Sequence, residues 1–363
     1  MSDTIRRWAE ATALTLLTLA VPGCGGDAGG PIEPPPSEPP QSEPPQQLPA
    51  PRGQAIYGVD LHNQLVLFGT ESPGTLSRKV PITGLPILKR IVGIDFRPSN
   101  GKLYGVGNDS RVYIIDPVSG AATAVGTGPF EPAIDFFEVH FGMGFDPATE
   151  RIRLMVAESG ANYSINPDDG TAVLEKSVSY ATGDPNEGIT PRISGLGYVP
   201  LGAAAVGGAA VAARRSGSAA LGPSPLAGTL LALDADEGTL IASIDPETGE
   251  FTTIGPLEMI FARCAEIKVG VGPDGKVNIF AVVLSAAKNL LLRLDALTGK
   301  ATSLGAVADN DSPIQGIALG ESPAGTAPPM AAAERWASGA VATMSYTPTT
   351  IDASACTGSS RGK

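Results

Sequence analysis

Hydrophobic residues occur along the chain in short runs separated by Gly, Pro or Asn, and these runs come in groups of four. The clearest group reads VGIDFRP, KLYGVG, RVYIID and AATAVG over residues 92–126. Short apolar runs bounded by turn residues are typical of antiparallel β-strands. The pattern therefore predicts an all-β protein whose repeating unit is four short strands.

The phrase that ends each unit recurs at a regular spacing. It reads IIDPVSGAATAVG, SINPDDGTAVLE, SIDPETGEFTTIG and LDALTGKATSLG, and the spacing is 50 residues from Asp116 to Asn166, 79 to Asp245 and 50 to Asp295. A period near 50 residues with four strands is that of a β-propeller blade. The longer interval contains an Ala- and Gly-rich insertion, residues 201–228, which we expect between the first and second strands of one blade.

The residue types of the recurring motif are those found in tight turns. We expect the side chains of Asp116, Asn166 and Asp245 to accept hydrogen bonds from backbone N–H groups two residues on. The glycine that follows permits the positive φ that such turns need.

The two ends of the body complement each other. The segment from Gln54, QAIYGVDLHNQLVLFG, lacks a first strand, whereas PIQGIALGESP at 313–323 is a lone first strand. Pairing AIYGVD with IQGIALG closes a five-bladed β-propeller over residues 54–320 and leaves no terminal blade uncovered. Residues 321–363 show no blade pattern and are expected to form a disordered tail.

The motifs also carry a family resemblance. From Leu65 to Asn186 the chain contains LVLFGTESPG, GIDFRPSNGKLYGVG, SRVYIIDPVSGAATAVG and FDPATERIRLMVAESGANYSINPDDG. In this combination it resembles the bacterial family of domain of unknown function 4394, and the match continues more weakly to Gly320. The resemblance implies a secreted or cell-surface propeller-like domain and supplies no catalytic residues.

The N-terminus has the layout of an export signal. Arg6 and Arg7 precede an apolar run from Ala11 to Val21, which is too short to span a bilayer as a helix and is followed by Cys24. The stretch resembles a bacterial lipoprotein signal, with residues 1–23 removed and Cys24 lipidated. An ordinary signal peptide with an incidental cysteine is the alternative.

The residues after Cys24 extend this hypothesis. Residues 24–53 are Pro-rich and are expected to form an extended linker. Gly25 stands where an Asp would indicate inner-membrane retention in many Gram-negative bacteria, so the resemblance favours the outer membrane.

Net charge and cysteine content limit the binding partners and the disulfide bonds that can be expected. The net charge is −12 without a basic stripe, which excludes nucleic acid as a partner. Cys264 and Cys356 remain after Cys24 is assigned, so no disulfide framework is expected and Cys264 is interpreted as a small buried hydrophobe. We expect a monomer that contacts the membrane through its lipid anchor alone.

Metal chemistry has little support in the sequence. With only two histidines, a multi-histidine metal site is hard to build, and no cofactor is expected. Calcium is the exception, because Asp234, Asp236 and Asp245 in DADEGTLIASID supply oxygen ligands near a glycine. The stretch does not complete a calcium-binding loop, and an acidic β-turn is the alternative.

Paired acids in the central funnel would indicate a glycosidase, by resemblance to other five-bladed propellers. The first strands offer Asp95, Arg97 and Asp146 as candidate funnel residues. One or two acids do not make a catalytic constellation.

The sequence therefore favours a non-enzymatic protein: a surface-anchored lipoprotein that presents a β-propeller to a protein or glycan as a binding or scaffold module. One alternative is a funnel-site hydrolase or lyase acting on a carbohydrate or lactone. Another is a structural component of the cell envelope. The side chains that line the central channel would best discriminate among the three.

Overall fold

The computed structural model describes residues 48–134, 140–201, 227–243, 245–261, 264–272, 276–308 and 312–320. Regular structure in these ranges is almost entirely β, with a single short 3-10 turn, η1, at Pro246–Thr248. No helix in this part of the chain is long and apolar enough to cross a membrane.

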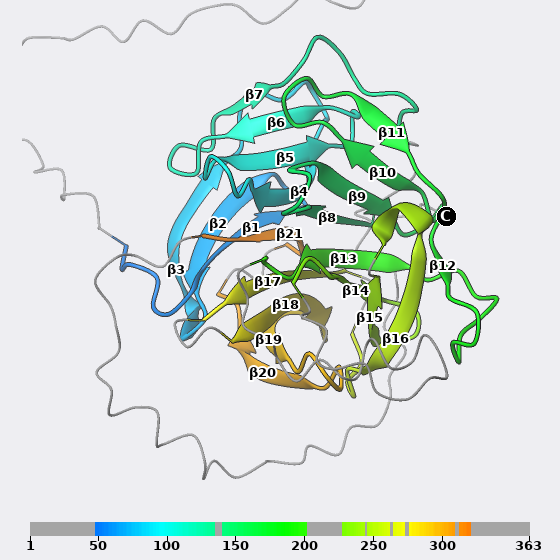
Figure 1. Ribbon diagram of the computed structural model, residues 1–363. Helices are drawn as coiled ribbons and strands as arrows, with labels where there is room; N and C mark the ends of the chain where they lie inside the picture. Colours follow the sequence, from blue (N-terminus) through cyan, green and yellow to red (C-terminus); the bar gives the residue numbers. More distant parts are fainter. Residues whose placement is uncertain are drawn as a thin grey trace, which may run out of the picture. The chain divides into compact units, whose positions relative to one another are not determined.

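The strands form five sheets, which we call blades and number in chain order (Figure 1). From the innermost strand outwards, blade 1 is β21 (Ile314–Leu319), β1 (Ala55–Asp60), β2 (Gln64–Gly69) and β3 (Ser72–Pro81). Blade 2 is β4 (Ile91–Phe96), β5 (Leu103–Gly107), β6 (Val112–Ile115) and β7 (Ala122–Ala124). Blade 3 is β8 (Phe141–Phe145), β9 (Ile152–Val156), β10 (Asn162–Ile165) and β11 (Ala172–Leu174). Blade 4 is β13 (Ile193–Tyr198), β14 (Leu230–Asp234), β15 (Thr239–Ser243) and β16 (Glu250–Pro256), with β12 (Ser179–Tyr180) added in parallel at its outer edge. Blade 5 is β17 (Ala265–Val271), β18 (Val277–Ser285), β19 (Lys288–Leu294) and β20 (Ala301–Ala306).

The five innermost strands form a ring. Strand β4 contacts β8, β8 contacts β13, β13 contacts β17, β17 contacts β21, and β21 contacts β4. In Figure 1 these strands lie at the centre and the outer strands radiate from them. The molecule is therefore a five-bladed β-propeller, as the repeats predict.

Blade 1 closes the ring from both ends of the body. Strand β1 pairs antiparallel with β21, with Ile56 opposite Leu319 and Gly58 opposite Ile317. The Gly320 N–H also donates to the carbonyl of Ala55 across 3.0 Å. The predicted pairing of AIYGVD with IQGIALG is confirmed.

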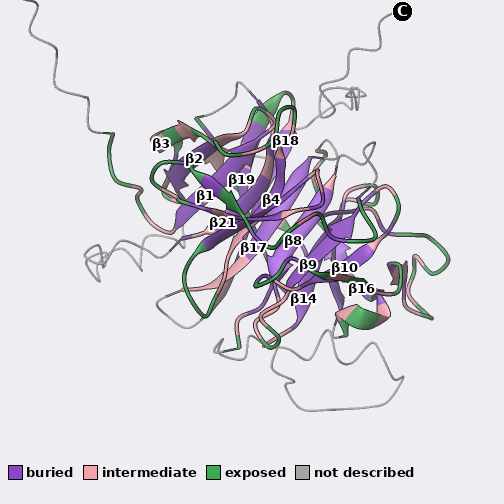
Figure 2. Ribbon diagram, turned by 90° about the horizontal axis from the view of Figure 1, so that it is seen from above, coloured by how far each residue is buried: buried purple, intermediate pink, exposed green. Residues whose placement is uncertain are grey.

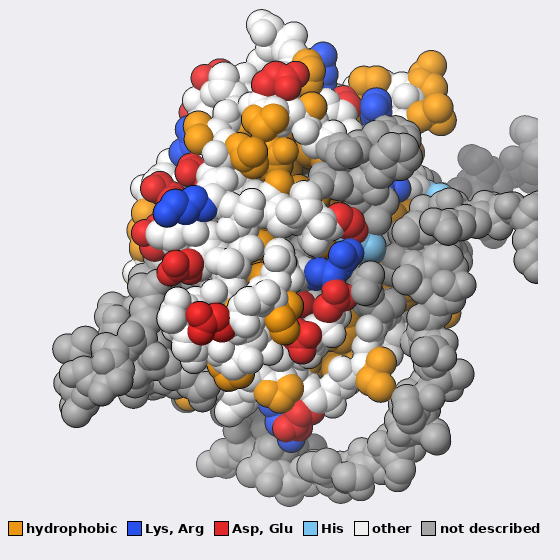
Figure 3. Space-filling view, turned by 90° about the vertical axis from the view of Figure 1, so that its right-hand side faces the viewer, with side chains coloured by type: hydrophobic (Ala, Val, Ile, Leu, Met, Phe, Trp, Pro, Cys, Tyr) orange, Lys and Arg blue, Asp and Glu red, His pale blue; other side chains and the backbone are white. Residues whose placement is uncertain are grey.

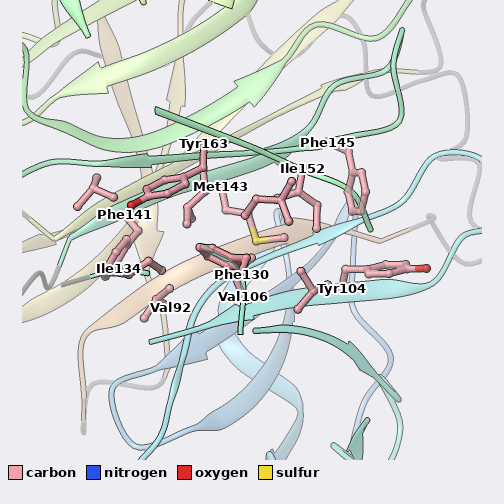
Figure 4. Packing of buried hydrophobic residues seen from close by; sticks show 14 of the residues in the cluster. Val92, Tyr104, Val106, Phe130, Ile134, Phe141, Met143, Phe145, Ile152 and Tyr163 are labelled. Carbon is pink, nitrogen blue, oxygen red and sulfur yellow. The ribbon is translucent and has the colours of Figure 1, made fainter. Parts of the chain in front are cut away.

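The hydrophobic core lies between neighbouring blades. One cluster of buried side chains bridges each pair of adjacent blades around the ring. Figure 4 shows the cluster between blades 2 and 3, where Val106 and Tyr104 face Met143, Phe145 and Ile152. Figure 2 shows the same distribution from above, with burial concentrated in the strands. A single blade would expose both apolar faces, so stacking around the ring is what stabilises each sheet.

Two of the three predicted turn bonds are present. Asp116 Oδ1 accepts from the N–H groups of Val118 and Ser119, both at 2.8 Å, and Asn166 Oδ1 accepts from that of Asp168 at 3.0 Å. The prediction for Asp245 is wrong. Its side chain makes no capping hydrogen bond, because the chain enters η1 at Pro246 instead of the turn found in the other copies.

The insertion begins and ends at one point of blade 4. The Val199 N–H donates to the carbonyl of Thr229 at 2.9 Å, and the Gly228 N–H donates to that of Val199 at 2.8 Å. Residues 202–226 lie outside the described ranges, but their flanks join β13 to β14. The insertion therefore falls between the first and second strands of a blade, where the repeat spacing places it.

The interpretation of Cys264 requires a correction. The residue is buried against Leu284, as a small hydrophobe would be. It is also disulfide-bonded, contrary to the expectation that the cysteines form no disulfide framework. Cys24 and Cys356, the other cysteines of the chain, lie outside the described residues.

Candidate functional site

Glycines let the innermost strands approach one another at the centre of the ring. A Cβ atom added to Gly195 would lie 2.6 Å from the Cα of Glu266, and one added to Gly93 would lie 2.6 Å from the Cβ of Met143. Real Cβ atoms do not tolerate such distances. The glycine of the recurring first-strand motif is therefore explained by close strand packing around the axis.

A pocket of about 400 Å³ opens where the innermost strands end. Every blade contributes to it, so it lies on the axis of the ring. We call it the axial pocket. The residues that line it are Asp95, Phe96, Pro98, Phe145, Pro147, Gly197, Tyr198, Pro200, Leu201, Lys268, Val269 and Leu319.

Residues at and just after the end of the innermost strand form most of the pocket wall in three of the blades. Phe96 and Pro98 come from blade 2, and the same spacing places Phe145 and Pro147 in blade 3 and Tyr198 and Pro200 in blade 4. Three neighbouring blades thus each contribute an aromatic residue and a proline. The wall is apolar, and it is held in place by the same turns that define the repeat.

Asp95 lies at the base of the pocket and is half-buried. Its Oδ1 accepts from its neighbour, the Phe96 N–H, at 3.0 Å, and its Oδ2 accepts from the Phe145 N–H of blade 3 at 2.9 Å. Burial raises the pKa of this carboxyl, while the charge of Lys268 and the two N–H groups oppose the rise. Asp95 therefore joins blades 2 and 3 and still presents lone pairs to the pocket.

Lys268 is almost fully buried beside Asp95. Its Nζ donates to the carbonyl of Met143 in blade 3 and to that of Leu196 in blade 4, the latter at 3.1 Å. The same Nζ lies 3.5 Å from Oε1 of Glu266. The ammonium group thus donates two of its three protons to backbone carbonyls of other blades and lies against a buried carboxyl group.

Glu266 is fully buried behind Lys268. Its Oε1 accepts from the N–H groups of Leu196, at 2.9 Å, and Ile267, at 3.0 Å, whereas Oε2 has no hydrogen-bond partner. Burial raises the pKa of this carboxyl to about 8, and the charge of Lys268 opposes the rise. The side chain is therefore mostly protonated at neutral pH.

We call Asp95, Glu266 and Lys268 the axial polar cluster. An innermost strand has one edge without a neighbouring strand, and the N–H and C=O groups on that edge need partners. The axial polar cluster supplies them for β8 and β13. Gln315 does the same for β4, since its Nε2 donates to the carbonyl of Ile91.

The other two candidate funnel residues lie elsewhere. Arg97 bridges blades 2 and 3 at their surface: its Nε donates to Glu150 at 3.1 Å, and its two terminal nitrogens donate to Asp168. Asp146 half-buries its side chain in a turn, where Oδ1 accepts from the Ala148 N–H at 2.8 Å. Neither lines the axial pocket, whereas Asp95 does.

The candidate calcium residues are separated by a strand. Asp234 and Asp236 lie at one end of β15, and Asp245 follows its other end. Asp234 is buried and accepts from the Asp236 N–H at 2.9 Å and from the Tyr180 hydroxyl at 2.6 Å. Among the described residues, no three His, Cys, Asp or Glu side chains cluster as a metal site would require.

A second ionic cluster lies where the innermost strands begin. His140 precedes β8, Arg192 precedes β13, and both contact Oε1 of Glu158, Arg192 at 3.3 Å. Burial raises the pKa of Glu158, but the hydrogen bond from His140 and the nearby charges outweigh it and lower the pKa overall.

The outer surface carries both signs of charge: the face in Figure 3 shows acidic and basic side chains interspersed.

Sequence reasoning missed Glu266 and Lys268, which belong to the most irregular copy of the repeat. The available signal was AEIKVGV, a strand with charges at alternate positions within an apolar run. Alternate residues of a strand share one face, and in a propeller the faces of an innermost strand are buried. Two charges on one such face point to a buried polar cluster.

A ring of antiparallel blades with a polar cluster on its axis defines the class: a closed five-bladed β-propeller. The chain belongs to the family of domain of unknown function 4394, whose profile matches residues 64–318. This confirms the family resemblance. No curated protein matches the chain.

Several solved structures are similar to this chain at low identity. The nidogen/laminin complex has a chain with 12% identity and a TM-score of 0.42, covering 74% of this chain and 99% of the other. A protein of unknown function from Bacteroides caccae has 10% identity and a TM-score of 0.44, covering 74% and 100%. A putative 6-phosphogluconolactonase from Bacteroides uniformis has 15% identity and a TM-score of 0.35, covering 70% and 68%.

Proposed function

We propose that this protein is an exported, lipid-anchored β-propeller that acts as a binding module at the cell surface. The observation that supports binding over catalysis is the use of the axial polar cluster. Lys268 is buried and donates to two backbone carbonyls, and both oxygens of Asp95 accept backbone N–H groups. Groups committed in this way hold blades together and are poorly placed to transfer protons.

The anchor in this proposal is Cys24, and its support comes from the order of segments in the sequence. The export signal, the cysteine and the Pro-rich residues 31–53 follow one another directly. As a polyproline helix of ~3.1 Å per residue, the latter stretch would hold the body up to ~70 Å from the membrane. A binding module on a surface gains reach from such a spacer.

The funnel-site hydrolase or lyase is retained as the second candidate because of one observation. Asp95 has a raised pKa and lines a pocket, as a general acid would. Among the described residues that line the pocket, however, Asp95 is the only carboxyl group. A two-carboxylate glycosidase mechanism needs a second one within reach.

The anchor is tested by metabolic labelling with an alkyne fatty acid in a bacterial host that processes lipoproteins. The full-length protein should incorporate the label and fractionate with membranes, and Cys24→Ser should lose both properties. Labelling of the Cys24→Ser variant, or membrane retention after its signal is cut, would overturn the anchor.

Binding and catalysis are separated with purified full-length protein and soluble envelope glycans. Saturable retention of glycans whose mass spectra do not change is the expected result. Release of shorter products by the native protein, but not by Asp95→Asn, would replace the binding module with the hydrolase or lyase. Absence of any saturable ligand would favour the structural envelope component.

A further inference from the structure

The axial pocket combines apolar walls with a charged base. Its walls are the aromatic and proline residues of blades 2, 3 and 4, together with Val269 and Leu319. Its base is Asp95 and Lys268. A pocket of this volume lies within the range of small-molecule sites.

The hydrogen-bonding capacity of the base is one-sided. Lys268 is almost fully buried, donates to the carbonyls of Met143 and Leu196 and lies against Glu266, so it has little donor capacity to offer the pocket. Each Asp95 oxygen accepts one backbone N–H and retains further lone-pair capacity. A ligand that reaches the base must therefore donate hydrogen bonds, through hydroxyl, amide or ammonium groups.

The charge of the base discriminates among these donors. The positive charge of Lys268 acts on the Asp95 carboxyl, and burial raises the pKa of both Asp95 and Glu266. The base therefore carries no excess negative charge. An ammonium ligand would gain little from Asp95 and would be repelled by Lys268, whereas a neutral hydroxyl meets no such cost.

The walls restrict the ligand further. Apolar surface from three blades favours a ligand with an apolar face, so a small, fully hydrated polyol fits poorly. A pyranose ring has both required features: C–H faces that pack against aromatic and proline rings, and hydroxyl groups at its edge that donate to a carboxylate.

We propose that the axial pocket binds one pyranose ring of a glycan, with Asp95 accepting hydrogen bonds from its hydroxyl groups. This inference rests on the proposed binding function and names the ligand class and the site. A peptide ligand is the competing possibility, and the experiment distinguishes it.

Saturation-transfer difference NMR on the full-length protein provides the test. The probes are the methyl β-pyranosides of glucose, galactose, mannose and N-acetylglucosamine, with butylamine and a proline-rich peptide as counter-probes. At least one glycoside should receive saturation at its ring C–H protons, and butylamine should not. Saturation of the peptide or the amine without any glycoside would overturn the inference.

Two variants locate the site. Asp95→Asn should weaken glycoside binding by about tenfold or more, because a charge-assisted hydrogen bond is lost. Val269→Phe should abolish binding by filling the pocket, and it leaves the axial polar cluster untouched, so it decides the question if Asp95→Asn fails to fold. The matched control is Asp146→Asn, the same chemical change at a turn outside the pocket, which should bind normally.

The same experiments show whether the axial pocket alone is wrong or whether the proposed binding function is wrong as well. If Val269→Phe keeps the envelope-glycan binding of the native protein, binding occurs on another surface. The axial pocket is then excluded, and the binding module stands. If neither protein retains any glycan, both proposals fall.

Discussion

Blades 2 and 5 contain the same four-strand unit but contribute differently to the centre of the ring. The innermost strand of blade 2, IVGIDF, follows the repeat and carries one charge, Asp95. That of blade 5, AEIKVGV, departs from the repeat and carries Glu266 and Lys268. These two side chains bond to backbone groups of blades 3 and 4, whereas Asp95 bonds to blade 3 alone besides its own blade.

The difference shows what a repeat can and cannot encode. Each regular unit specifies its turns and the apolar faces that meet its neighbours, and this suffices to build the ring. The inner edges of the strands converge on one axis, where five identical charged side chains would repel one another. Blade 5, whose sequence departs from the repeat, instead supplies one carboxyl group and one ammonium group, Glu266 and Lys268, near the axis. Its irregular sequence therefore has a structural role.

Removing the closing strand should have the largest effect on this arrangement. Truncation after Asp309 removes β21, which leaves β1 with an unpaired edge and opens the apolar interface between blades 1 and 5. The truncated protein should aggregate or lose cooperative thermal unfolding. Truncation after Glu321 is the matched control and should change little when all proteins are compared under reducing conditions, which remove the Cys264 disulfide from each of them. Cooperative unfolding of the shorter protein at the native temperature would refute ring closure as a requirement.

Removing the buried ammonium group of blade 5 should have the next largest effect on stability. Lys268→Met leaves the carbonyls of Met143 and Leu196 without a donor, so we expect about 1–3 kcal/mol of destabilisation. The control is Lys300→Met, which removes an exposed pair with Glu258 and should cost less than about 1 kcal/mol. Urea denaturation measures both. Equal costs would show that the axial polar cluster contributes no more than a surface pair.

The pH dependence of stability sharpens the comparison between the two acids of the cluster. Glu266 has a folded-state pKa near 8, well above the usual range, so the folded state keeps a proton that the unfolded state releases. Its contribution is favourable at low pH and is lost as pH rises from about 4.5 towards 8, by up to about 1.4 kcal/mol per pH unit.

Glu266→Gln does not titrate, so this loss should be absent. The difference in unfolding free energy between Glu266→Gln and the native protein should therefore shift in favour of the variant as pH rises from 5 to 8. Denaturant midpoints at each pH provide the measurement. A constant difference across that window would mean that Glu266 is ionised in the folded state.

Substitutions in the turn at Asp116, which follows the repeat, and in the turn at Asp245, which departs from it, should have smaller effects on stability. Asp116→Ala removes two hydrogen bonds to backbone N–H groups and should lower the unfolding temperature, whereas Asp245→Ala removes none and should leave it nearly unchanged. Thermal unfolding of the two variants side by side is sufficient. A larger effect at Asp245 would contradict the turn geometry.

Deleting the insertion should have the smallest effect. Hydrogen bonds from Val199 to Thr229 and from Gly228 to Val199 already hold its two ends together, so a short turn can replace residues 202–226. The unfolding temperature should move by no more than a few degrees. Loss of folding would show that the inserted residues pack against the body.

Most of the fold was predictable from the sequence because it depends on the residue types in each turn and strand and on the spacing at which they recur. Turn residues, short apolar runs and the 50-residue spacing gave the blades, and the two incomplete ends gave their closure. The turn at Asp245 was not predicted correctly, because Pro246 began a 3-10 turn that the similar letters did not reveal.

The candidate site was predictable only in part. Asp95 stood out as an acid in a regular first strand, and it does line the axial pocket. Glu266 and Lys268 did not stand out, because their copy of the repeat matches the others poorly and their partners are backbone groups in other blades. Arg97 and Asp146 share the motif of Asp95, but their position just after the strand directs them to ion pairs and turns at the surface.

The pairing of β1 with β21 also determines how the body would respond to mechanical load. Strand β1 is hydrogen-bonded on both edges, to β2 and to β21. A force transmitted through the N-terminal linker reaches the body at the start of this strand. Traction along the strand loads both ladders in shear at the same time, so many hydrogen bonds must break together before the strand moves. Ring closure thus places the first strand of the body within a sheet instead of on its edge, so a load applied to the chain before Ala55 is borne by the blade that closes the ring.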